Sequence, residues 1–72
     1  MHIRHLDHSC LFLEISGARI LVDPGNFSVE RVHKFSPTGL DAIIITHQHA
    51  DHCDAELLAE VLTNNLRAVV LA

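Results

Sequence analysis

The residues best suited to chemistry lie in one short segment, Thr46 to His52, which holds three histidines and one aspartate. The segment follows an apolar run and precedes a helical pattern, so it falls where a buried strand ends and a helix begins. Residues two apart in an extended chain point to the same side, so His47 and His49 can face one point. The turn into the helix then brings Asp51 and His52 back towards that point. Imidazole and carboxylate side chains together suit zinc, or another first-row metal such as iron or manganese.

Four ligands so close in sequence would crowd a single ion. Two neighbouring ions, one bound by His47 and His49 and the other by Asp51 and His52, relieve that crowding. Such a site would lie beyond the carboxyl end of a parallel strand, where open α/β sheets bind their ligands. The sequence therefore predicts a metal centre with room for two ions.

The elements that must position this segment follow from the apolar patterns. Five strands are predicted, over His2–Leu6, Cys10–Ile15, Ala18–Val22, Leu40–Thr46 and Leu66–Leu71. The second and third strands form a hairpin around the Ser16-Gly17 turn, and the third ends at Asp23-Pro24-Gly25, where glycine is expected to allow a sharp reversal.

Two helices are predicted between the later strands. The first is short, is capped by Ser28 and ends before Pro37. The second spans Asp54 to Asn65, with Asp51 or Asp54 as its N-cap. A strand-helix-strand unit of this length gives parallel strands. The fold class is therefore α/β (α+β), a mixed sheet in which a hairpin leads into a β-α-β unit.

The composition is that of an ordinary globular protein. The 72 residues allow at most one domain, and 49% of them are apolar. A formal net charge of −4 and only three aromatic residues make nucleic acid an unlikely partner. No apolar run approaches the roughly 18 residues of a membrane helix, so we expect no membrane contact and a cytoplasmic location.

The remaining histidines and cysteines are assigned no chemistry. Cys10 and Cys53 lie far apart and form no Cys-x-x-Cys motif, so we expect two free thiols. Three other histidines are expected to face solvent: His2, His5 and His33.

The segment from Thr46 to His52 resembles the His-x-His-x-Asp-His signature of the metallo-β-lactamase fold superfamily. The resemblance extends upstream, where Ile20 to Gly25 is similar to the family's first motif, a strand that ends in Asp before a Pro-Gly turn. His8-Ser9-Cys10 is similar to the His-Ser start of the lactonase-like branch of metal-dependent hydrolases. The resemblance covers residues 3 to 72.

This resemblance implies a role for each matching residue. His47 and His49 would bind the first metal ion, Asp51 and His52 the second, and both ions would be zinc, with iron or manganese possible. A bridging water would attack an ester, lactone, amide or phosphodiester bond of a small-molecule substrate. Asp51 would also orient that water and take up a proton. Asp23 would position the histidine-bearing loop without binding metal, and His8 would lie near the mouth of the site.

The family's fold is an αββα sandwich of two similar halves, and residues 1–72 are expected to be an incomplete amino-terminal portion of one such domain. The family's later ligands, two histidines and an aspartate, have no match here. One face of the sheet would stay apolar and exposed. We therefore expect a missing carboxy-terminal half, a second chain or self-association to cover it. The alternative to a hydrolase is a non-catalytic metal-binding or assembly module.

Overall fold

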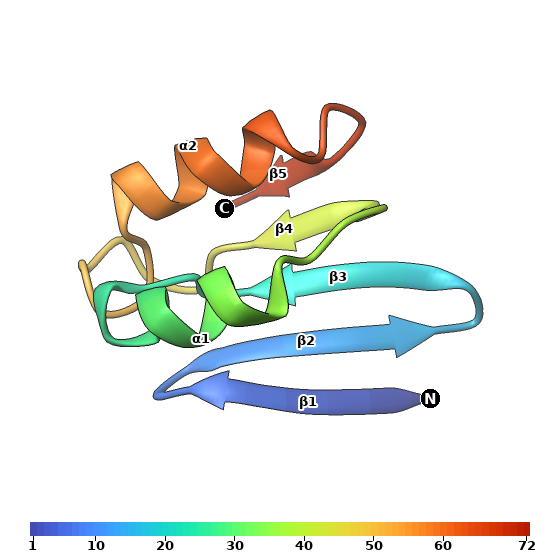
Figure 1. The fold of residues 1–72 in the computed structure, drawn as a ribbon, viewed down its shortest axis with the longest axis horizontal. Helices are drawn as coiled ribbons and strands as arrows, with labels where there is room; N and C mark the ends of the chain where they lie inside the picture. Colours follow the sequence, from blue (N-terminus) through green and yellow to red (C-terminus); the bar gives the residue numbers. More distant parts are fainter.

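The computed structural model describes all 72 residues and contains one mixed sheet with two helices (Figure 1). The strand order along the sheet is β1-β2-β3-β4-β5. The strands are β1 His2–Asp7, β2 Cys10–Ile15, β3 Ala18–Val22, β4 Ala42–Ile44 and β5 Val69–Leu71. The first three are antiparallel and the last two run parallel to β3. The predicted fold class, a hairpin leading into a β-α-β unit, is confirmed.

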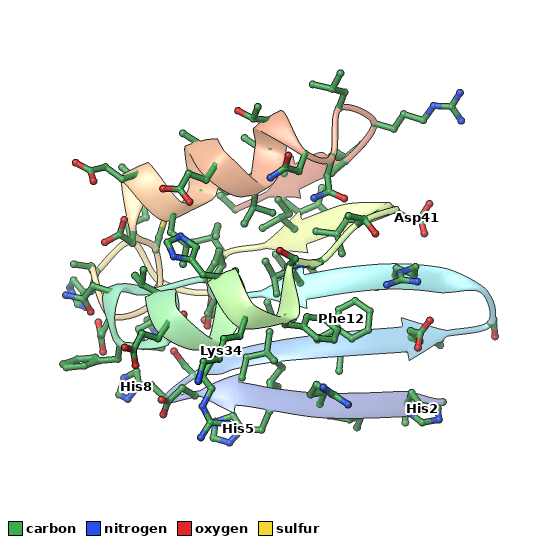
Figure 2. All side chains as sticks on the ribbon, in the orientation of Figure 1. His2, His5, His8, Phe12, Lys34 and Asp41 are labelled. Atoms are coloured by element: carbon green, nitrogen blue, oxygen red, sulfur yellow. The ribbon has the colours of Figure 1, made fainter.

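Tight turns join the antiparallel strands. Ser16 and Gly17 both have positive φ, 50° and 85°, which is the type I′ geometry that matches the twist of a two-residue hairpin. At the other end of β2, the register shifts between His5 and Asp7. Asp7 and His8 there have φ of 131° and 49°. This irregular turn brings His8 to the same end of the sheet as the loops after β3 and β4 (Figure 2).

The parallel strands are joined by helical crossovers. A 3-10 turn, η1 (Asn26–Ser28), and helix α1 (Val29–Phe35) connect β3 to β4, and helix α2 (Ala55–Thr63) connects β4 to β5. Asp54 is the N-cap of α2, and its side chain accepts a hydrogen bond from the Leu57 amide at 2.9 Å. None of these helices has the length and hydropathy needed to cross a membrane.

Both helices lie on one face of the sheet, which we call the covered face (Figure 1). The cross-strand partners Phe12, Leu21 and Ile43 are buried there against Val32 of α1 and Leu57 of α2. The alternation of side chains along the strands sends the next residues to the other side. That side, which we call the open face, carries His5 and a set of apolar residues: Ile3, Leu11, Leu13, Ile15, Ala18, Ile20, Val22, Ala42, Ile44, Val69 and Leu71.

Three local predictions need correction. The strands predicted over Leu40–Thr46 and Leu66–Leu71 are shorter, because their outer residues leave the ladder; Leu66 is 89% exposed. Ser28 occupies the N-cap position of α1 but does not cap it, because its hydroxyl donates to the Gly25 carbonyl at 2.8 Å. Asn65 does more than end a helix: it is buried, and it bonds to the backbone of Pro37 and Leu40 in the loop before β4 and of Val61 in α2.

Candidate metal centre

The candidate centre lies in three loops at the end of the sheet where β3 and β4 finish, on the left in Figure 1. The loop after β4 supplies Asp51 and His52, the end of β3 supplies Asp23, and the turn between β1 and β2 supplies His8. The backbone links these loops: the Asn26 amide donates to the Ala50 carbonyl at 2.8 Å, and the Asp54 amide donates to the Pro24 carbonyl at 2.9 Å.

Asp23 is the buried anchor of this end of the sheet, with 3% of its surface exposed. Its carboxylate accepts hydrogen bonds from the Thr46 amide at 2.7 Å, from the Thr46 hydroxyl, and from His52 Nδ1 at 2.9 Å. Burial alone would raise the pKa of Asp23, but the bonds from His52 and Thr46 outweigh it and hold that pKa below its usual value. The carboxylate is therefore charged and fully engaged with the loop after β4.

The same hydrogen bonds fix which nitrogen of two histidines carries a proton. His52 Nδ1 must be protonated, because it faces a carboxylate that can only accept. The single proton of the Thr46 hydroxyl goes to Asp23, so His47 Nδ1, 3.1 Å from that hydroxyl oxygen, must be the donor in their contact. The neutral forms of both rings then keep a free lone pair on Nε2, the form in which a histidine binds metal.

Three side chains bring potential ligand atoms close together. Atoms of His8, Asp51 and His52 lie within 4.8 Å of one another. His52 Nε2 lies 3.7 Å from Asp51 Oδ2, and His8 Nε2 donates to the same oxygen at 3.0 Å. This hydrogen bond from His8 holds the pKa of Asp51 below its usual value. Two ligands about 2.1 Å from a tetrahedral zinc are about 3.4 Å apart, so the donor set and its spacing fit a zinc-type ion.

The structure brings some of the predicted site residues together and leaves one apart. Asp51 and His52 come together, and the ring of His47 lies against that of His52 with centroids 4.6 Å apart. His49 is exposed and outside the cluster of close ligand atoms; its carbonyl instead accepts from the His52 and Cys53 amides. His8, expected at the mouth, contacts Asp51 directly. The roles of His47, His49, Asp51 and His52 as metal ligands stay predictions.

Several residues that shape the site could not be assigned a role from the sequence. The Thr46 hydroxyl links two site residues, because it donates to the Asp23 carboxylate and accepts from His47 Nδ1. The Ser9 hydroxyl donates to the Asp51 carbonyl at 3.3 Å, and the Phe27 ring packs on His8 with centroids 5.1 Å apart. The only available signal was that Thr46 and Ser9 lie inside the segments that carry the family resemblance.

Gly25 is needed for a different reason from the one predicted. Its φ of −92° is open to any residue, so the turn itself does not require glycine. A Cβ at this position would instead lie 1.9 Å from the Asp51 carbonyl oxygen. Gly25 thus lets two loops touch directly beneath the candidate ligands.

Comparison with known proteins places this geometry in a family. The model of a beta-lactamase superfamily domain matches residues 2–71. The chain belongs to the beta-lactamase superfamily. The resemblance to the metallo-β-lactamase fold is thereby confirmed, and the mixed sheet with its two helices corresponds to the amino-terminal part of that fold.

Individual relatives in this superfamily have diverse names. The chain is 47% identical to Protein Rv0786c of Mycobacterium tuberculosis over 73 residues, which is all of this chain and 32% of that protein. It is 39% identical to the UPF0173 metal-dependent hydrolase R01310 of Rhizobium meliloti, over 72% of this chain and 24% of that one. It is 38% identical to the transcription termination factor FttA of Methanocaldococcus jannaschii, over 69% of this chain and 9% of that one.

The chain spans about a third of the length of the mycobacterial relative and less of the other two. No solved structure matches it.

Proposed function

We propose that the protein is a metal-dependent hydrolase that uses zinc and acts on a small-molecule ester, lactone, amide or phosphodiester. The observation that carries the proposal is the Asp23 network, which leaves Nε2 of both His47 and His52 free for a metal ion. Histidines that bind metal commonly donate their other ring N–H to a hydrogen-bond acceptor, which fixes the tautomer and the orientation of the ring. The buried Asp23 carboxylate does this for His52 directly and for His47 through Thr46. Membership of the superfamily and the relative named a metal-dependent hydrolase support the same activity.

In this proposal Asp51 and His52 hold one zinc ion and His47 and His49 hold a second. Zinc supplies a nucleophile at neutral pH, by lowering the pKa of its water, and polarises the bond under attack. His49 must turn inward to take part, and its exposed position at the loop surface leaves it free to do so. Iron or manganese suits the same imidazole and carboxylate ligands.

Asp51 is the proposed catalytic residue. Its low pKa keeps it ionised near neutral pH, so it can accept a hydrogen bond from a water and hold that water in line with the substrate. His8 donates to one of its oxygens, Oδ2, and so restricts the carboxylate's rotation. The other oxygen has no side-chain partner within the chain.

We further propose that the open face is covered by a second half-sandwich, supplied by further residues of the same protein, by a second chain or by another copy. Four of its apolar side chains are more than a third exposed, namely Ile3, Ile15, Val69 and Leu71. The greater length of the relatives favours the first source. The two free cysteines fit a reducing compartment, and we propose a cytoplasmic location.

The proposal is tested by metal content and hydrolysis in the intact protein that carries this sequence. His52→Ala should lose bound zinc, by mass spectrometry of the dialysed protein, together with hydrolysis of ester, lactone and phosphodiester probes. His2→Ala, an exposed histidine at the far end of β1, is the matched control and should change neither. Bound zinc without hydrolysis of any probe would favour the alternative, a non-catalytic metal-binding or assembly module.

Asp23→Asn separates positioning from ligation. The amide keeps the shape of the carboxylate but loses acceptors for Thr46 and His52, so the histidines are no longer held in one tautomer. Zinc affinity should fall about 10–100-fold while the fold is kept, as is typical for residues that orient ligands. An unchanged zinc affinity, measured by competition with a chelating dye, would contradict the positioning role of Asp23.

A further inference from the structure

A groove lies between β1 and α1, beside the candidate metal centre but separate from it. It has a volume of about 460 Å³ and is lined by Arg4, His5 and Leu6 of β1 and by Arg31, Lys34 and Phe35 of α1. Lys34 of α1 and His8 lie at the same end of the sheet (Figure 2). The His5 side chain donates to the His8 carbonyl, which joins the groove to the turn that carries His8.

The groove concentrates positive charge in an acidic chain. Three of the five basic residues of the sequence line it, although the formal net charge is −4. No acidic residue lines it, and Arg4, Arg31 and Lys34 form no ion pair with any carboxylate. Arg31 and Lys34 lie three residues apart on α1, so they share one face of the helix.

One of these cations is held in place by an aromatic ring. The Arg4 guanidinium carbon lies 5.1 Å from the centroid of Phe35, which is a cation–π contact. This contact leaves the edge of the guanidinium, with its N–H donors, available for an anion. Two guanidinium groups and one ammonium converging on one hollow match the several oxygens of phosphate better than a single carboxylate.

We propose that this groove binds the phosphate groups of a small phosphorylated ligand. A compact anion is favoured over a nucleic acid strand for two reasons. The surface beyond the groove is acidic overall and would repel an extended polyanion. The Phe35 ring already contacts Arg4 and Phe12, so it offers no free face for stacking bases. The proposal does not depend on metal binding or hydrolysis.

The experiment measures binding of inorganic diphosphate to the intact protein by titration calorimetry, in EDTA and with His47 and His52 replaced by alanine. These conditions remove binding through a metal ion, so the result is independent of the function proposed above. Diphosphate should still bind, and added salt should weaken it because the attraction is electrostatic. Lys34→Gln and Arg31→Gln should each weaken binding roughly three- to fivefold, as expected for partly exposed charge pairs.

Arg67→Gln is the matched control, because it removes the same charge from an exposed loop at the opposite end of the sheet. It should leave diphosphate affinity unchanged. The proposal is overturned by three outcomes: no binding in EDTA, an equal loss in the Arg67 variant, or tighter binding of a short single-stranded RNA than of diphosphate. The last result would identify the groove as a nucleic-acid surface.

Discussion

The two faces of the sheet are both apolar at the centre of the strands but have very different surroundings. On the covered face, Leu21 and Ile43 are fully buried beneath the two helices. On the open face, their sequence neighbours Val22 and Ile44 are only partly buried, and Val69 is 56% exposed. Strands this apolar on both sides are typical of sheets covered on both faces. The difference supports the proposal that a second layer packs on the open face, since the helices of the 72 residues cover only the other one.

The largest expected effect is on the free energy of unfolding, and it is tested by comparing two adjacent residues of β4. Ile43→Ala should lower the free energy of unfolding by about 2–5 kcal/mol, because it leaves a cavity in the packed core. Ile44→Ala should cost about as much in the intact protein, where we propose that the open face is covered. Both costs are measured by urea unfolding. A cost of only about 1 kcal/mol for Ile44→Ala, the value for a half-exposed side chain, would show that the open face stays open.

A second prediction tests how tightly the covered side packs where it reaches the metal centre. Gly25→Ala should cost about 1–3 kcal/mol, because its Cβ has no space against the Asp51 backbone. It should also lower zinc affinity by moving Asp51. Asn26→Ala, at the exposed neighbouring position, is the control and should change zinc affinity little. Calorimetric zinc titration of the two variants makes the comparison, and equal affinities would mean that the loops tolerate displacement.

A third prediction concerns association through the open face. The isolated 72-residue chain should sediment as a dimer or larger species, because its apolar open face is otherwise in water. Leu13→Lys places a charge in the middle of that face and should shift the distribution towards monomer. Leu66→Lys makes the same change at an exposed position outside the sheet and should not. A monodisperse monomer for the unmodified chain in analytical ultracentrifugation would contradict this prediction.

The smallest effect is a difference in thiol reactivity. Cys10 is fully buried on the covered face, and this burial raises its pKa to about 11. Because a raised pKa keeps the thiol protonated, Cys10 should not react at about pH 8. Cys53 is partly exposed, so a thiol reagent should label one site per chain, and Cys53→Ser should abolish it. Labelling of Cys10 in the folded protein would mean that the covered face opens readily.

Much of the fold could be predicted from local patterns. Strands β1 to β4 and both helices were predicted within two residues of their ends, since alternation, helical spacing and turn residues are local properties. The start of β5, three residues after the predicted Leu66, could not be predicted, because a strand extends only as far as its neighbour pairs with it. Apolar residues such as Leu66 continue past that point without a partner.

For the candidate site, the sequence by itself determined the residue types and their motif: His47, His49, Asp51 and His52 after a buried strand, and Asp23 at the end of another. The tertiary structure alone decided which atoms meet. It brought His8 to Asp51 across 43 positions and joined Asp23 to Thr46 and His52. The physical reason is that spacing along a chain fixes only which side chains share a face. Contacts between loops depend on strand order and on close approaches of the backbone, such as that of Asp51 to Gly25. The local sequence does not show which segments approach each other in this way.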